Sequence, residues 1–306
     1  MNKMHLGVNL SFAMNRYAEP EEWVRIVTEE LKLKYVQFFT DLLDPLFSPP
    51  SFRYRMCEKI KKLCKENSLK IHSVFTGTSP HCFNLLLHPE KEMRKFTLKW
   101  YEEAIKMSAQ MDSSGFGSFL GAFSKKDLKN KERKESLTEE LIEHWHYLAS
   151  LAKKEGLKFL LFEPMSCERE IPSTIKETKW FYQRLNENSS LPFELCLDTG
   201  HGRRISGEAE DNNPYAWLEE FKDNNLVIHL QQTDRIASRH WPFTEDLNQK
   251  GVIQAEKVIN ILKNNKKDIF LFLEVIYPPF EPFDELIIDD LKKSVKYWKK
   301  ALNIKE

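Results

Sequence analysis

Four residues able to bind a metal ion or to transfer a proton each follow an apolar run of this chain. They are Glu163, Asp198, His229 and Glu274. About 30 to 45 residues separate each from the next, which fits one strand followed by one helix. If the runs are neighbouring parallel strands of a closed barrel, all four side chains emerge at its carboxyl end, where barrel enzymes hold their active sites. Three carboxylates and one imidazole there predict a site for one divalent ion, with Mn²⁺, Mg²⁺ or Co²⁺ favoured and Zn²⁺ left open.

Taken singly, each of these residues has a simpler explanation. A Glu that ends a strand is often a surface residue or a helix cap, and a His inside an apolar run is usually a hydrogen-bonded core residue. Asp198 is the more specific signal, because Leu-Asp-Thr-Gly-His-Gly is glycine-rich directly after a strand, where the backbone must approach something closely. Four such residues at one level of a barrel favour the metal site, since buried carboxylates without a cation are costly.

Apolar runs alternate with amphipathic, charge-rich stretches along the sequence. The predicted strands are Leu6–Leu10, Tyr35–Phe39, Lys70–Phe75, Gly115–Leu120, Lys158–Phe162, Phe193–Leu197, Leu226–Leu230 and Ile269–Leu273. The predicted helices are Glu19–Leu33, Tyr54–Asn67, Glu90–Met111, Thr138–Glu155, Pro172–Asn186, Pro214–Asp223, Gln254–Asn264 and Glu285–Ala301. Apolar strands that alternate with helices indicate a parallel sheet covered on both faces. Eight such units predict an α/β protein with one (β/α)8 TIM-barrel domain over residues 1–306.

Two segments are predicted to be long loops on the catalytic face. Asp41–Phe52 is rich in proline, and Phe123–Leu137 is rich in Lys and Glu. Loops of this length after barrel strands often act as lids. For the charged segment we favour a solvated connection over a lid.

Composition excludes several classes of protein. Lys+Arg and Asp+Glu both number 46, so no basic excess is available to bind nucleic acid. No run approaches the ~20 apolar residues that a membrane span requires. The 5 cysteines show no disulfide-like spacing, which favours free thiols in a reducing cytoplasm. We expect a cytoplasmic protein whose partner is a small molecule, with neither nucleic acid nor membrane; a homo-oligomer stays open.

With these residues in place, the chain resembles the xylose isomerase-like TIM barrels, and specifically their sugar isomerase and epimerase branch, which includes D-tagatose 3-epimerase. The resemblance implies that Glu163, Asp198, His229 and Glu274 hold the metal. It also implies that Glu163 and Glu274 are the catalytic acid and base. The family has a substrate-contacting His three residues after the Asp, which is His201 here. It has an Arg six residues after the metal-binding His, which is Arg235 here.

Three further segments are similar to the erythrulose-phosphate isomerases and epimerases, a subgroup that acts on short phosphorylated ketoses. They are residues 162–174, 229–234 and 238–244. The sequence Gln-Gln-Thr-Asp between His229 and Arg235 departs from the free-sugar epimerases, which puts a direct copy of their substrate contacts in doubt.

A phosphate on the substrate would need fixed donors. Arg235, Arg239 and His240 are predicted to bind the substrate from the segment after the seventh strand, and Arg203-Arg204 forms a second basic group after the sixth. Arg can bind phosphate through two parallel hydrogen bonds. Solvent-facing loop charge is the alternative interpretation.

These residues predict an isomerase that works through an enediolate. A metal bound to substrate oxygens stabilises the charge that develops when a proton beside a ketone is removed. One Glu removes the proton and the other returns one, so that the chain is an epimerase or an aldose–ketose isomerase. Two alternatives stay open: a zinc-dependent DNA repair enzyme that resembles endonuclease IV, and a non-catalytic sugar-binding barrel.

Overall fold

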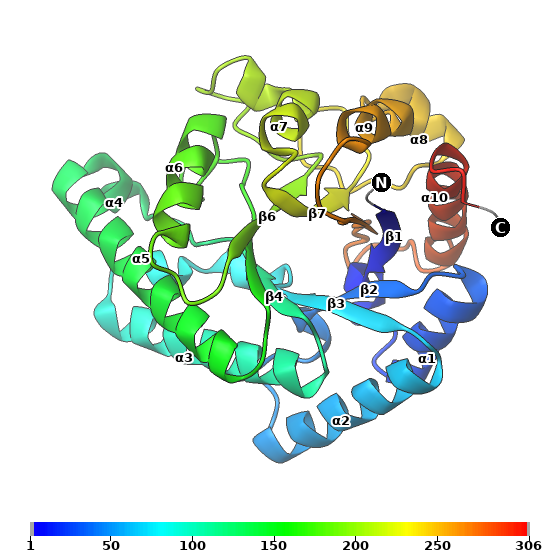
Figure 1. Ribbon diagram of the computed structural model, residues 1–306, viewed down its shortest axis with the longest axis horizontal. Helices are drawn as coiled ribbons and strands as arrows, with labels where there is room; N and C mark the ends of the chain where they lie inside the picture. Colours follow the sequence, from blue (N-terminus) through cyan, green and yellow to red (C-terminus); the bar gives the residue numbers. More distant parts are fainter. Residues whose placement is uncertain (1–2, 305–306) are drawn as a thin grey trace.

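A closed barrel of eight parallel strands forms the centre of the molecule (Figure 1). This computed structural model describes residues 3–304, apart from the side chains of residues 225 and 226. Each strand pairs with the next in the sequence, and β1 closes the circle by pairing with β8. The strands are β1 (Met4–Asn9), β2 (Tyr35–Phe39), β3 (Lys70–Phe75), β4 (Gly115–Ser118), β5 (Phe159–Phe162), β6 (Phe193–Asp198), β7 (Asn225–Leu230) and β8 (Ile269–Leu273). The eight predicted strands and the predicted TIM barrel are confirmed. A single domain over residues 1–306 stays a prediction.

Helices surround this barrel on the outside (Figure 1). They are α1 (Pro20–Arg25), α2 (Pro50–Glu66), α3 (Lys91–Gln110), α4 (Lys125–Lys129), α5 (Lys131–Lys154), α6 (Ile175–Asn186), α7 (Pro214–Phe221), α8 (Glu245–Lys250), α9 (Ala255–Leu262) and α10 (Ile287–Ala301). Proline stands in the first turn of α1, α2 and α7, where its missing N–H costs nothing. The predicted first helix is divided, because a π-helical turn at Ile26–Glu30 follows α1.

Alternation along the strands decides which side chains enter the barrel. Phe159 and Leu161 on β5, Cys196 on β6, Val227 on β7 and Phe272 on β8 belong to one buried cluster that fills the interior. Successive side chains of a strand point to opposite faces, so the residue two positions further along also faces inward. Glu163, Asp198, His229 and Glu274 are the next inward positions on these four strands. The strands thereby deliver all four to one end of the barrel.

Small residues in β1 and β4 make room for the interior rings. A Cβ atom added to Gly7 would lie 2.5 Å from the Phe272 ring, and one added to Gly115 would lie 2.2 Å from the Phe159 ring. These glycines are needed because large rings on neighbouring strands occupy the space.

The predicted loop Phe123–Leu137 is wrong, because most of it is helical. Ser124 caps α4 by accepting a hydrogen bond from the Asp127 backbone N–H (3.0 Å). Asn130 caps α5 in the same way through the Arg133 N–H (2.9 Å). Side-chain oxygens that accept the first free N–H groups are strong helix starts, and here they outweigh the run of charge. The other predicted loop is irregular from Leu43 to Pro49.

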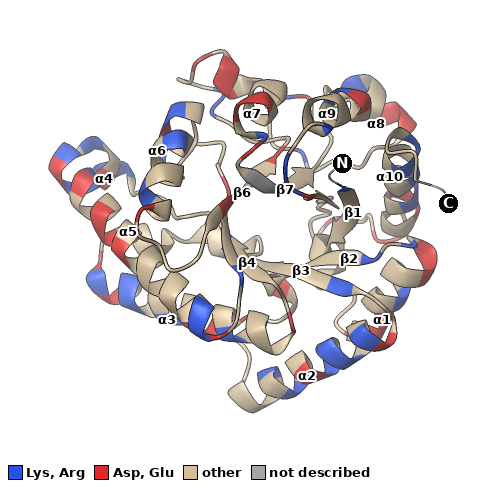
Figure 2. Cartoon of the chain, in the orientation of Figure 1, with Lys and Arg blue, Asp and Glu red and all other residues tan. Residues whose placement is uncertain are grey.

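Charge is spread over the outer helices in both signs. Figure 2 shows Lys and Arg interspersed with Asp and Glu on α2, α3, α5 and α10, with no large area of one sign in this view. In residues 3–304, no helix is long and apolar enough to cross a membrane.

Candidate metal centre and active site

The four predicted metal ligands meet at the carboxyl end of β5 to β8. One ligand atom from each of Glu163, Asp198, His229 and Glu274 lies within 4.8 Å of the others. Their exposed fractions are 3%, 8%, 0% and 5%. Asp198 and His229 are paired residues in adjacent strands, and the Glu274 backbone N–H donates to the Leu230 carbonyl. The pairing of neighbouring strands fixes these backbone positions, so the strands themselves bring the four residues together.

The donor set fits a divalent cation. Asp198 Oδ1 accepts a hydrogen bond from Gln231 Nε2 (2.8 Å) and one from the Gly200 backbone N–H. Asp198 Oδ2 is buried and has no hydrogen-bond partner among the described residues. A buried carboxylate oxygen without a partner is costly unless a cation binds it. Three carboxylates and one imidazole are ligands typical of Mn²⁺, Mg²⁺ or Co²⁺.

Protonation within this cluster reflects the crowding of acidic groups. Burial alone would lower the pKa of His229, but its acidic neighbours Cys196, Glu274 and Glu163 raise it well above its usual value. Burial would likewise raise the pKa of Glu274, but the charge of His229 lowers it. Burial raises the pKa of Asp198. The cluster therefore favours a positive charge at its centre.

Besides His229, which contacts both glutamates, each glutamate has one further histidine beside it. His201 Nδ1 lies 3.5 Å from Glu163 Oε1 and 3.2 Å from the Pro164 carbonyl oxygen. His240 Nδ1 lies 3.6 Å from Glu274 Oε2, and the two imidazole rings are 6.0 Å apart. The structure thus brings the predicted substrate-binding residues His201 and His240 to the metal cluster.

A cavity of about 340 Å³ opens onto these groups. Its walls include Glu163, Glu274, His201, His240, His81 and Ser166. Asp198 and His229 are not among its lining residues. The cavity is at the lower end of the range for small-molecule sites. A bound molecule would meet both glutamates, with the other two ligand residues behind them.

The predicted arginines lie outside this lining. Arg235 donates to the carbonyl oxygens of His201 (2.9 Å) and Asn212 (3.0 Å), and burial lowers the pKa of its guanidinium to about 10. Arg239 is paired with Asp234 (2.9 Å), which lowers the pKa of that carboxyl to about 2. Arg235 therefore braces the loop that carries His201, and Arg239 lines a neighbouring cavity that shares His240 and Ile276 with this one.

Arg203 and Arg204, the second basic group, also have different partners. Arg203 donates to Ser173 Oγ (2.7 Å) and to Glu177 (2.9 Å), and so holds the segment before α6. Arg204 donates to the Gly200 carbonyl (2.6 Å), but its Nε is buried and has no partner among the described residues. Arg204 therefore has a hydrogen-bond donor that no described residue uses.

Sequence reasoning missed several residues of the site. Gln37 on β2 contacts His229, Gln231 on the loop after β7 contacts Asp198, and His81 and Ser166 line the cavity. Gln37 carried a signal, because it is the one strongly polar residue of the apolar run Tyr35–Phe39. The others lie in loops, where the sequence has no periodicity to read.

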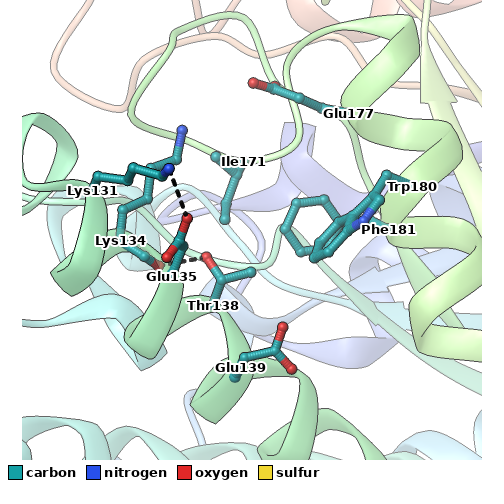
Figure 3. Close-up of a pocket in the computed structure, with 9 residues that line it drawn as sticks. All are labelled: Lys131, Lys134, Glu135, Thr138, Glu139, Ile171, Glu177, Trp180 and Phe181. Atoms are coloured by element: carbon teal, nitrogen blue, oxygen red, sulfur yellow. Dashed lines mark hydrogen bonds and ion pairs between the residues drawn. The ribbon is translucent and has the colours of Figure 1, made fainter.

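A second groove, of about 380 Å³, lies on the outside between α5 and α6 (Figure 3). Lys131, Lys134, Ile171 and Trp180 are among its walls, and Lys131 is paired with Glu135. It contains no cluster of metal ligands in the described part of the chain. Among the described residues, the other group that could hold a metal ion is Glu163, Cys196 and His229. It shares Glu163 and His229 with the four-residue cluster. Among residues 3–304, therefore, no separate group of ligands is present for the several zinc ions that the DNA repair alternative requires.

Comparison with known proteins shows the family of this chain. The model of the xylose isomerase-like TIM barrel family matches residues 27–301. D-erythrulose 1-phosphate 3-epimerase of Brucella abortus is 27% identical over 295 residues, which are 96% of this chain and 94% of that protein. A protein of Rhodospirillum rubrum, provisionally named a xylose isomerase, has a crystal structure that superposes with a TM-score of 0.87. It is 31% identical and covers 97% of this chain and 99% of its own.

A more distant structure shares the fold alone. D-psicose 3-epimerase from Clostridium cellulolyticum, solved with D-tagatose, has a TM-score of 0.69 and 15% identity over 98% of this chain and 99% of its own. The predicted resemblance and the predicted isomerase class are confirmed. The match to the family model extends over most of the barrel, with Glu163, Asp198, His229 and Glu274 at its carboxyl end, and the chain belongs to the xylose isomerase-like TIM barrel family.

Proposed function

We propose that this protein is a metal-dependent isomerase or epimerase of a short ketose phosphate, such as a tetrulose phosphate. Glu163, Asp198, His229 and Glu274 would hold one divalent ion, with Glu163 and Glu274 also transferring protons. The observation that carries this proposal is which of the four residues line the cavity. Both glutamates face the cavity, whereas Asp198 and His229 lie behind it.

The two glutamates have the chemistry that the reaction needs. One carboxylate removes a proton from the carbon beside the substrate carbonyl, which leaves an enediolate. For epimerisation the other carboxyl group returns a proton to the opposite face of the same carbon; for isomerisation the proton goes to the adjacent carbon. A bound divalent ion supplies polarisation of the substrate oxygens. Positioned proton transfer of this kind contributes about 10²–10⁴ in rate.

The histidines and the cavity would position the substrate. His201 and His240 stand next to Glu163 and Glu274 and can donate hydrogen bonds to hydroxyl or carbonyl oxygens. The small volume suits a sugar of few carbons. Arrangement of reacting groups in such a pocket removes much of the entropic barrier.

Three observations support a phosphate on the substrate. Arg204 has a buried Nε–H with no partner among the described residues, and Arg239 lines a neighbouring cavity that shares His240 with the cavity at the glutamates. The relative from Brucella abortus is named for a phosphorylated tetrulose. A phosphate held far from the reacting carbon lets binding energy position a small sugar.

The test is turnover in D₂O of tetrulose phosphates and of the matching free ketoses. We expect deuterium at the carbon beside the carbonyl, and a higher kcat/KM for a phosphorylated substrate. A product without solvent hydrogen would point to hydride transfer and contradict the glutamate mechanism. Faster turnover of free D-tagatose or D-fructose than of any ketose phosphate would contradict the substrate class and leave the metal centre intact.

A further inference from the structure

A row of polar side chains crosses the barrel on strands that contribute none of the four ligands. Asn9 on β1, Gln37 on β2 and Ser73 on β3 are each 0% exposed. They are joined to one another and to His229 and Glu274 by hydrogen bonds. Buried polar residues of this kind need a reason, because an apolar side chain would cost less to bury.

The direction of the first hydrogen bonds follows from the backbone. The Ser11 N–H can only donate, and it donates to Asn9 Oδ1 (2.8 Å). The amide nitrogen of Asn9 must then face the barrel, where it donates to Gln37 Oε1 (2.8 Å) and Glu274 Oε1 (3.2 Å). The Gln37 atom that receives this bond is therefore its oxygen, and Gln37 Nε2 donates to Ser73 Oγ (3.1 Å).

The same oxygen decides where the hydrogen of His229 lies. His229 Nε2 is 2.6 Å from Gln37 Oε1, and an amide oxygen only accepts. Nε2 therefore carries a hydrogen. The other ring nitrogen, Nδ1, lies 3.0 Å from Glu163 Oε1 and 3.1 Å from Glu274 Oε2, within the ligand cluster. In the neutral ring this is the nitrogen whose lone pair is free to bind an ion.

We propose that Asn9 and Gln37 are positioning residues that prepare His229 and Glu274 to bind the metal. Gln37 holds the hydrogen of neutral His229 on Nε2 and leaves Nδ1 for the ion. Asn9 orients the Gln37 amide and holds Glu274 Oε1, so that Oε2 faces the cluster. The inference rests on the proposed function, since it takes the ion to bind at these four residues.

The physical reason for such a device lies in the carboxylates themselves. Glu163 and Glu274 attract a hydrogen to Nδ1, which would block that nitrogen as a ligand. An acceptor on the far side of the ring favours the opposite tautomer. Groups that orient metal-bound histidines in this way are typically worth about 10–100-fold in metal affinity.

The test measures Mn²⁺ binding to metal-free protein by calorimetry for the parent, Gln37→Met and Gln37→Glu. Met keeps the length of the side chain but removes the amide acceptor, so we expect about 10–100-fold weaker binding. Glu keeps an oxygen that accepts from Nε2–H, and we expect affinity equal to or above that of the parent. Ser118→Ala is the control, because the Ser118 hydroxyl is buried on β4 and bonded to Tyr101 and Thr76, not to a ligand side chain. Its backbone carbonyl, which accepts the Glu163 N–H, is unchanged in alanine. We expect its affinity to stay within about twofold of the parent.

Thermal unfolding of each metal-free variant checks the fold, and Gln37→Ala gives the same comparison if Met does not fit. Parent-like affinity without the acceptor, or equal losses for Met and Glu, would overturn the inference while the metal centre stands. A parent that binds no divalent ion would overturn the proposed function and this inference together.

Discussion

Asp198 is the ligand whose surroundings most clearly anticipate an ion. One of its oxygens is held by Gln231 and the Gly200 backbone, and the other is buried with no partner in the described part of the chain. The residues around it therefore fix the carboxylate without using the oxygen that would bind the metal. Two predictions concern this residue and its neighbour His229, and a third concerns the glutamates.

Asp198→Asn should remove metal binding with little change of shape. The Asn Oδ1 can still accept the Gly200 N–H, but the charge at the free oxygen is lost. We expect most bound Mn²⁺ to be absent by elemental analysis and activity to fall at least about 100-fold. Chelation of the parent should abolish activity, and Mn²⁺ or Co²⁺ should restore it. Asp268→Asn, a carboxylate paired with His5 at the start of β8, is the matched control. Full metal content in Asp198→Asn would contradict the ligand assignment.

Metal binding should weaken as the pH falls. The pKa of His229 and that of Asp198 are both raised in the metal-free cluster, so each holds its proton to a higher pH than usual. An ion needs the deprotonated forms, and protons therefore compete with it below those raised values. Calorimetry in two buffers of different ionisation enthalpy should show proton release on Mn²⁺ binding. Affinity independent of pH between about 6 and 8 would contradict this.

Glu163→Gln and Glu274→Gln should each fold but lose about two or more orders of magnitude in kcat, because the positioned base or acid is removed. For an epimerase, a variant that keeps the base but lacks the acid should still exchange substrate hydrogen with D₂O faster than it forms product. Nuclear magnetic resonance distinguishes exchange from product formation. Glu103→Gln, whose carboxylate is paired with Arg53 and does not line the cavity, is the control. Parent-like rates in both glutamate variants would contradict the assignment of acid and base.

The loops after β6 and β7 are held together by Arg235. Its guanidinium donates to the carbonyls of His201 and Asn212, and its own backbone is in the left-handed region (φ 65°). A loop braced in this way keeps His201 in place beside Glu163. Arg239 belongs to the same segment, but its partner is the carboxylate of Asp234. The two arginines should therefore respond differently to substitution.

Arg235→Ala should destabilise the protein by about 1–3 kcal/mol, since the His201 and Asn212 carbonyl groups lose hydrogen bonds to a charged donor. It should lower kcat/KM for phosphorylated and free ketoses alike. Arg239→Ala should leave the unfolding temperature nearly unchanged and reduce kcat/KM only for the phosphorylated substrate. Denaturant unfolding and paired kinetics on both substrates check this. The reverse pattern, with Arg235→Ala selective for the phosphate, would assign the substrate contact to Arg235.

At the scale of the whole molecule, closure of the barrel couples the two ends of the described chain. β1 pairs with β8 along five residues, from Met4 with Ile269 to Val8 with Leu273. Neither terminal part can leave without opening the sheet and exposing unpaired backbone groups. Trp23, Trp145 and Trp298 are buried on α1, α5 and α10, so they report on three separate places around the barrel.

A single-domain chain should unfold as one unit. We expect tryptophan fluorescence and far-ultraviolet circular dichroism to give coincident transitions in denaturant. Trp145→Phe should shift the fluorescence amplitude without separating the two curves. Two resolved transitions would show that part of the barrel unfolds independently and would contradict the single-domain prediction.

The sequence predicted the barrel, which is confirmed, and it predicted four candidate ligands that the structure brings together at one end of the barrel. Alternating apolar and amphipathic runs repeat at the spacing of strand–helix units, and a ligand at the end of a parallel strand has only one edge at which to emerge. Composition and periodicity are local, so they can be read without coordinates. The Lys and Glu residues of 123–137 predicted a loop, but the segment is mostly helical because Ser124 and Asn130 cap two helices there.

The tertiary structure alone decided what surrounds the ligands. Gln37 and His229 are 192 positions apart in sequence and become neighbours only because eight strands close into a circle. In the loops after β6 and β7, Arg235 donates to backbone carbonyls, and the Nε–H of Arg204 has no partner among the described residues. Such contacts depend on which side chains meet across the barrel and between its loops. The spacing of residues along the sequence does not show these contacts, because loops can bring donors from distant parts of the chain to one acceptor.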